Sequence, residues 1–152
     1  FEDALNSLTT TTFDDWVARN LAPFEIFHSL SSFGICSHRV AKDRFGSITV
    51  CDRGSSHILY QKDILTEEYE RWGLTAPEFA QKIVARELEE YEECDLIFAP
   101  SNFVFYSFIE KGVPPEKIKL IPYGVDTEMF YPIPKKVYVF RVIYVGALSI
   151  RK

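Results

Sequence analysis

The chain has 152 residues, 47% of them hydrophobic, and a formal net charge of -5. This composition is typical of a globular domain with a sizeable apolar core, and the net negative charge argues against a nucleic-acid-binding protein. The longest apolar runs are far shorter than the ~20 residues of a membrane-spanning helix, so we expect no such helix.

The three cysteines, Cys36, Cys51 and Cys94, are widely spaced and include no Cys-x-x-Cys pair. This pattern predicts reduced, buried thiols rather than a metal site or a disulfide framework.

Nothing near Phe1 resembles a signal peptide, so the sequence favours a cytoplasmic protein. The chain has no initiator methionine and ends within a basic segment, and we therefore expect it to be truncated at both ends.

Short apolar strands alternate with helices along the chain. This alternation predicts an α/β fold with a Rossmann-like, doubly wound parallel sheet covered by helices on both faces. In chain order, the predicted elements are a strand at 24–29, a helix at 33–44, a strand at 47–51, a helix at 58–72, a helix from 75 onward, a strand at 95–99, a helix at 103–111 and a strand at 118–122.

The helix from residue 75 opens with Thr75-Ala76-Pro77-Glu78, whose spacing predicts a capping box with a proline in its first turn. Its far end is unusually acidic. We interpret this acidic run as a solvated surface and not as a metal site. The glutamates of the run are Glu87, Glu89, Glu90, Glu92 and Glu93.

In an open parallel sheet, ligands bind beyond the carboxyl ends of the strands. The densest polar cluster at such a position follows the strand at 47–51. A glycine there can bring the backbone close to a ligand, while guanidinium, hydroxyl and imidazole groups can donate to sugar or phosphate oxygens. A loop that satisfies its own turn is the alternative interpretation. The candidate ligand-binding residues are Asp52, Arg53, Gly54, Ser55 and His57.

A second domain is predicted near the end of the chain. Residues 1–131 would form the N-terminal domain, the Pro/Lys-rich segment 132–138 a stiff linker, and residues 139–152 the first strand and following turn of the next domain. Charge is distributed unevenly, because residues 111–152 carry a net +5 and the remainder is acidic. This asymmetry fits either a solvated surface or an anionic ligand bound near the domain junction.

The segment RELEEYEECDLIFAPSNFVFYSFIEKGVPPEKIKLIPYGVDTEMFYP, followed by RVIYVGALSIRK, resembles the retaining glycosyltransferases of family 4, which have the GT-B fold. The resemblance covers roughly residues 23–152, and the combination of motifs is specific although each alone is weak. The matching positions are Asp95, Ser101, Gly112, Lys117-Ile118, Gly124-Val125-Asp126, and Phe130 followed by Pro132.

The resemblance implies a two-domain enzyme that transfers a sugar from a nucleotide-sugar donor to an acceptor hydroxyl with retention of anomeric configuration. The N-terminal domain would hold the acceptor, with the residues at 52–57 on the acceptor side. Gly146, Arg151 and Lys152 would bind the donor diphosphate. This sequence departs from the family where the strand at 47–51 ends, because Cys51-Asp52 stands at a position often held by histidine.

The same resemblance implies that neither a metal nor another cofactor is needed, since the nucleotide sugar is itself a substrate. The expected partners are this donor and a sugar, lipid or small-molecule acceptor, with no nucleic acid; peripheral membrane contact is left open. The chain by itself is expected to be inactive. Two alternatives stay open: a non-catalytic α/β binding module for an anionic metabolite or partner, and another GT-B enzyme such as an epimerase or phosphorylase.

Overall fold

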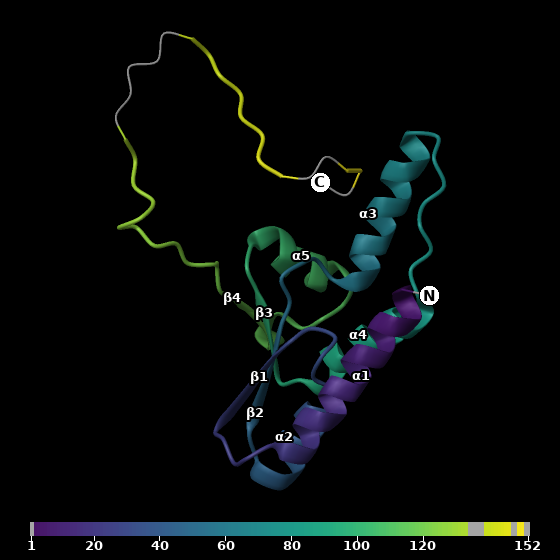
Figure 1. Cartoon of the computed structure of the whole chain (residues 1–152), viewed down its shortest axis with the longest axis vertical. Helices are drawn as coiled ribbons and strands as arrows, with labels where there is room; N and C mark the ends of the chain where they lie inside the picture. The colour runs from purple at the N-terminus through teal and green to yellow at the C-terminus, as the bar shows by residue number, and fades with distance from the viewer. Residues whose placement is uncertain (1, 134–138, 147–148, 151–152) are drawn as a thin grey trace. The chain divides into compact units, whose positions relative to one another are not determined.

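The computed structural model describes residues 2–133, 139–146 and 149–150, with side chains from Ser7 onward. The chain divides into two compact units, Phe1–Pro122 and Tyr123–Lys152. The helices and strands of the described residues all belong to the first unit (Figure 1). They are α1 (Glu2–Asn20), β1 (Ile26–Leu30), α2 (Ile35–Phe45), β2 (Ile48–Asp52), α3 (Ile58–Arg71), α4 (Gln81–Glu93), β3 (Leu96–Ala99), α5 (Asn102–Glu110), the 3-10 helix η1 (Pro115–Lys117) and β4 (Ile118–Leu120).

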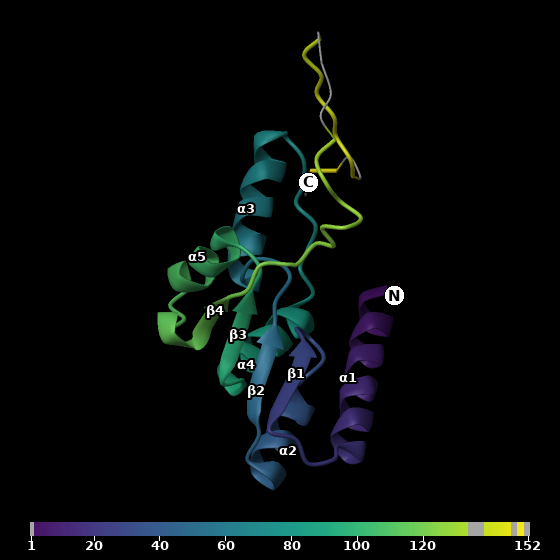
Figure 2. The ribbon, with the colours of Figure 1, turned by 90° about the vertical axis from the view of Figure 1, so that its left-hand side faces the viewer.

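The four strands form one parallel sheet in the order β1-β2-β3-β4. Consecutive parallel strands joined by right-handed crossovers place their connecting helices on one face of the sheet. Figure 2 shows the strands pointing the same way, with α2 and α4 behind them and no helix of the first unit's described residues in front. The predicted α/β class with a parallel sheet is confirmed, and the four strands predicted between residues 24 and 122 each overlap an observed one. Helices on both faces, as a doubly wound sheet would have, are not seen among the described residues, because strands in sequential order with right-handed crossovers place their connecting helices on one face.

The core lies between this sheet and the helices α4 and α5. Phe108 of α5 is fully buried at its centre, and its ring contacts those of Tyr91 and His57, with centroids 5.0 Å away in both cases. Cys51 and Cys94 are buried free thiols of the same cluster, as predicted. Cys36 is also free but only partly buried, so the prediction of a buried thiol is wrong at this position.

The helix predicted at 103–111 is observed as α5, one residue earlier at each end. Ser101 is its N-cap, and the Ser101 hydroxyl oxygen accepts a hydrogen bond from the backbone N–H of Val104 at 3.3 Å. Gly112 follows the helix with φ of +87°, a conformation that residues with a side chain rarely adopt. Residues close to the helix in sequence therefore specify where α5 begins and where it ends.

Helix α1 is not predicted by the sequence patterns. Its middle is a run of threonines, which have low helix propensity, and its apolar residues form no clear stripe. The hydroxyls of Thr11 and Thr12 donate to backbone carbonyls one turn earlier, at 2.8 Å each. What fixes the helix is tertiary packing on α2, where Asp14 and Ala18 of α1 are buried.

The predicted start of helix α4 is wrong. The capping box at residues 75–78 does not form, and α4 begins six residues after Thr75, at Gln81. Residues 71–78 are exposed apart from Ala76. An extra helical turn there would bury almost nothing, and packing supplies most of the stability of helices in proteins.

The interpretation of the acidic run as a solvated surface is wrong for two of its members. Glu87 is 4% exposed and Glu90 is fully buried, whereas Glu89 and Glu92 of the same helix are exposed. Residues three apart share one side of a helix, so Glu87 and Glu90 point together toward the strands and their loops. An acidic segment therefore has one face in solvent and one face in the core.

The second unit has no helix or strand within 123–133, 139–146 and 149–150. Asp126 closes a turn, since its Oδ1 accepts hydrogen bonds from the N–H groups of Glu128 and Met129 at 2.9 and 3.2 Å. Residues 139–145 do not form the predicted strand, because a strand requires a paired neighbour and the described residues supply none. Residues 134–138 of the predicted linker lie outside the described residues, and the assignment of 139–152 to a second domain stays a prediction.

No helix in the described part of the chain combines the length and the apolar character that crossing a bilayer requires.

Candidate functional site

The loops that follow the four strands lie at one edge of the sheet, because parallel strands end on the same side. Backbone hydrogen bonds tie these loops together. The N–H of Ser31 donates to the carbonyl of Asp52, and the N–H of Arg53 donates to the carbonyl of Phe98, both at 3.0 Å. The strand ends of β1, β2 and β3 thus form one continuous surface.

Asp52, the last residue of β2, contacts His28 of the neighbouring strand β1, with His28 Nε2 at 3.2 Å from Asp52 Oδ2. Their side chains are 24% and 49% exposed, and the imidazole also contacts the ring of Phe98 with centroids 5.5 Å apart. A carboxylate that orients an imidazole next to solvent can position a hydroxyl group of a ligand. Asp52 is therefore a predicted residue that the fold leaves accessible.

His28 lies at the end of the strand predicted at 24–29, where ligand contacts are expected, but no sequence pattern predicts its partner. It precedes Asp52 by 24 positions, and only the strand register, which sets His28 beside Val50 and Leu30 beside Asp52, brings the two side chains together.

Arg53 points into the protein and not toward solvent. Its Nη1 lies 3.0 Å from Glu87 Oε1, its Nε donates to the carbonyl of Ser56 at 3.2 Å, and its side chain is 11% exposed. The guanidinium is a planar group whose donors are fixed in direction, so these partners hold the loop in one shape. A direct contact between Arg53 and a ligand stays a prediction.

The other polar members of the loop divide in the same way. The hydroxyl of Ser55 donates to Gln61 Oε1 at 2.9 Å, which links the loop to the first turn of α3. Gly54 is exposed and lies between these two internally bonded residues. Gly54 and Asp52 therefore face solvent, whereas the side chains of Arg53 and Ser55 form hydrogen bonds within the protein.

His57 is buried at the start of α3. Its Nδ1 accepts a hydrogen bond from the N–H of Leu59 at 3.2 Å, and its backbone N–H donates to the hydroxyl of Ser107 at 2.9 Å. Burial, with a smaller contribution from Arg53 and Lys111, lowers the pKa of His57 to about 4. The neutral imidazole therefore acts as a helix cap and a core group in this structure, and its role in binding an acceptor stays a prediction.

Because His38 and His57 are buried, we predict that the protein loses stability in acid. Burial also lowers the pKa of His38 to about 4, against an ordinary value of 6.5. The unfolded chain then binds more protons than the folded chain between pH 6.5 and 4, so stability is present above pH 6.5 and is lost as the pH falls toward 4. We expect His57→Asn, which retains a capping oxygen, to reduce the loss between pH 7 and 4.5 by about 1–3 kcal/mol. Urea unfolding at the two pH values measures this difference, and an unchanged loss would contradict it.

The predicted donor-side residues are only partly described. Gly146 has φ of +154°, where a Cβ atom would lie 3.2 Å from the hydroxyl of Tyr144. Arg151 and Lys152 lie outside the described residues. The proposed diphosphate-binding role of these three residues therefore stays a prediction.

A parallel sheet with polar loops at its carboxyl edge defines a Rossmann-like α/β domain of the kind that binds small ligands. Residues 13–129 match the model of the family described as Glycosyltransferase Family 4. This match spans more than half of the chain and includes all four strands and the loops that follow them, so the chain belongs to that family. A search of curated proteins gives no match.

Proposed function

We propose that the chain is the acceptor side of a glycosyltransferase that moves a sugar from a nucleotide-sugar donor to an acceptor hydroxyl, with retention of configuration. The observation that carries the proposal is the family match over residues 13–129, which contains the accessible strand-end surface. In the GT-B arrangement proposed here, residues 139–152 begin the donor-side domain.

On the donor side, Arg151 and Lys152 would bind the diphosphate after the turn at Gly146. Negative charge grows on the diphosphate as it leaves, so fixed cations stabilise the transition state more than the ground state. A guanidinium can bind two oxygens at once, while an ammonium acts as a point charge. With two such cations, the proposed reaction needs no metal ion.

On the acceptor side, the His28–Asp52 pair would orient the attacking hydroxyl. In a retaining transfer without a covalent intermediate, the hydroxyl attacks on the same face of the donor sugar from which the diphosphate departs. Correct placement of the acceptor then contributes more than strong basicity. The partial exposure of both side chains and their separation of 3.2 Å fit this role.

Substitutions at this pair test the proposal. In the full-length protein, Asp52→Asn and His28→Gln are each expected to lower kcat/KM for the acceptor about tenfold to a hundredfold, because a misplaced hydroxyl attacks slowly. The KM for the donor should stay unchanged. A matched control is Asp63→Asn, which removes a carboxylate from α3 that pairs with Lys111 at 2.7 Å. Unchanged acceptor kinetics in both pair variants would show that this surface is not part of the acceptor site. A wild-type protein that binds a ligand but transfers no sugar would favour the alternative of a non-catalytic binding module.

A further inference from the structure

Three side chains of helix α4 bind all the polar groups of Ser32, which lies in the loop after β1. The Ser32 N–H donates to Glu90 Oε2 at 2.5 Å, and its hydroxyl donates to Glu87 Oε1 at 2.8 Å. Its carbonyl accepts from Arg86 Nε at 2.9 Å. Hydrogen bonds from helix α4, more than fifty residues away in sequence, thus fix a loop residue at the carboxyl edge of the sheet.

The conformation that these contacts hold is unusual. Ser32 has φ of +77°, and it is the one residue other than glycine with a positive φ in the described part of the chain. Such a conformation costs free energy and persists where the surroundings fix it, often next to a functional site. Two residues later, the N–H of Gly34 donates to Glu90 Oε1 at 2.6 Å. The carboxylate of Glu90 therefore binds the backbone of the loop at two positions, Ser32 and Gly34.

Glu87 connects this loop to the loop after β2. Its Oε1 accepts from the hydroxyl of Ser32 and from Arg53 Nη1, at 2.8 and 3.0 Å. Arg53 in turn binds the carbonyl of Ser56. One buried carboxylate oxygen therefore fixes the loops at 31–34 and 53–56 relative to each other, on either side of Asp52.

The helix residues are themselves held in place. Arg86 Nη2 lies 2.6 Å from Asp14 Oδ2, and Glu87 Oε2 accepts from the hydroxyl of Tyr91 at 2.7 Å. Burial raises the pKa of Glu90, while the N–H groups of Ser32 and Gly34 and the nearby Arg86 oppose this rise. Burial of two carboxylates costs free energy unless their oxygens accept hydrogen bonds. Here all four carboxylate oxygens of Glu87 and Glu90 have donors.

We propose that Arg86, Glu87 and Glu90 are positioning residues for the acceptor. They set the two loops that flank Asp52 as one rigid unit, so that a sugar hydroxyl meets a preformed surface. This inference rests on the proposed function, because the loops bind an acceptor only if the protein is a transferase. A purely structural network would change stability and leave substrate discrimination intact.

The first test needs no activity. In the isotope-labelled chain, Glu90→Gln places an amide NH₂ against one of the two N–H donors, and the backbone amides of Ser32 and Gly34 are expected to exchange with solvent about tenfold faster. Glu89→Gln is the matched control, because Glu89 is exposed on the same helix and pairs with Arg39. Unchanged exchange at Ser32 and Gly34 in a folded Glu90→Gln protein would overturn the inference.

The second test is kinetic and uses the full-length protein. Glu87→Leu is expected to raise the KM for the acceptor at least about tenfold, with donor KM unchanged, because a loop displaced by about 1 Å misplaces the acceptor. Glu87→Gln keeps an oxygen acceptor for Ser32 and Arg53, so it should restore much of the loss and also serves if the leucine variant does not fold. Equal KM values for wild type and both variants, or equal changes for donor and acceptor, would overturn the positioning role. Absence of transfer by the wild type would instead reject the proposed function, and the acceptor role of these residues with it, whatever the amide exchange shows.

Discussion

Replacement of Asp14 by alanine is expected to lower the free energy of unfolding by about 3–5 kcal/mol, because it leaves a largely buried guanidinium without its partner. Asp14 is fully buried, and its Oδ2 lies 2.6 Å from Arg86 Nη2. Its two carboxylate oxygens also accept from the N–H groups of Cys36 and Ser37, each at 2.9 Å. The substitution thus removes an ion pair and the cap of helix α2 together.

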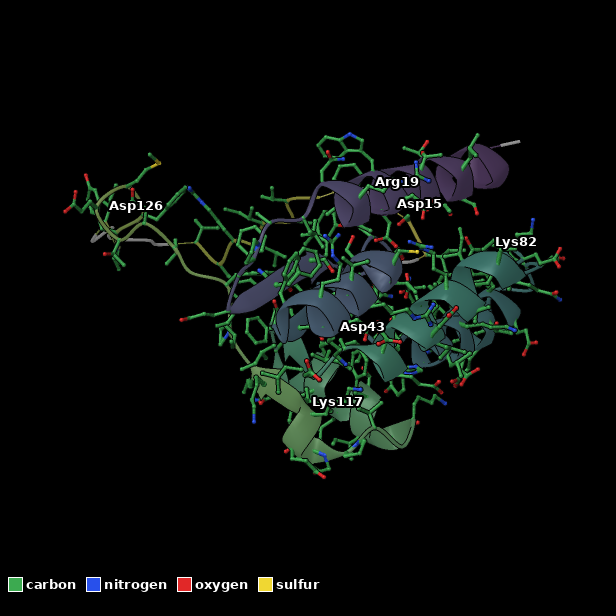
Figure 3. All side chains as sticks on the ribbon, turned by 90° about the horizontal axis from the view of Figure 1, so that it is seen from below. Asp15, Arg19, Asp43, Lys82, Lys117 and Asp126 are labelled. Atoms are coloured by element: carbon green, nitrogen blue, oxygen red, sulfur yellow. The ribbon has the colours of Figure 1, made fainter. Side chains whose placement is uncertain are left out.

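Urea unfolding followed by circular dichroism measures this loss. Asp43→Ala is the control, because Asp43 is an exposed carboxylate on α2 (Figure 3) and should change stability by less than about 0.5 kcal/mol. The double variant with Arg86→Ala should be destabilised by less than the sum of the two single variants, since the two residues interact directly. A loss below about 1 kcal/mol for Asp14→Ala would show that α1 does not depend on this contact.

Phe108→Ala is expected to cost about 3–5 kcal/mol, through lost apolar burial and the cavity that remains. The Phe108 ring is fully buried between those of Tyr91 and His57, so no solvent can fill the space without contacting apolar walls. The consequence extends to the candidate site, because the same ring packs against the residue that caps α3.

Phe103→Ala in the same helix provides the comparison for Phe108. Phe103 is 54% exposed and contacts Tyr60 with ring centroids 5.7 Å apart. Its removal should cost less than about 1 kcal/mol, since little area returns to water. Thermal or urea unfolding that gave similar losses for the two variants would contradict the assignment of the core to the interface of α5, α4 and the sheet.

The strands and the helix α5 could be predicted because their signals are local. Apolar runs bounded by turn residues located β2 and β3, and the serine and glycine that bound α5 act within a few residues of each other. Helix α1 could not be predicted, because its threonines disfavour a helix and its stability comes from contacts with α2, 22 or more residues further along the chain.

The candidate residues at 52–57 lie at the carboxyl edge of the sheet, as the sequence predicted, but the orientation of their side chains was not predicted. A cluster of donors at 52–57 indicates a polar loop, yet nothing local shows that Arg53 turns toward Glu87 or that His57 packs against Phe108. Those partners lie 34 and 51 positions away. His28, at the end of the strand predicted at 24–29, likewise reaches Asp52 only through strand register. Sequence patterns therefore located the edge, and tertiary contacts decided which groups face solvent.

The acidic run of α4 has a similar explanation. Charge alone favours solvent for every glutamate, because burial of an unpaired carboxylate is costly. Glu87 and Glu90 are buried because the loops after β1 and β2 supply donors to three of their four carboxylate oxygens, and Tyr91 of the same helix supplies a donor to the fourth. The helix thus connects the structural core to the surface that we propose as the acceptor side.

The most direct measurement of the proposed function is the release of nucleoside diphosphate by the full-length protein from a panel of nucleotide sugars, with the anomeric configuration of the product determined by proton NMR. The assay is run with candidate acceptors and with excess chelator. We expect acceptor-dependent release that persists in chelator and a product with the configuration of the donor. Absence of release from every donor, or a product with inverted configuration, would contradict the proposal that this chain is the acceptor side of a retaining glycosyltransferase.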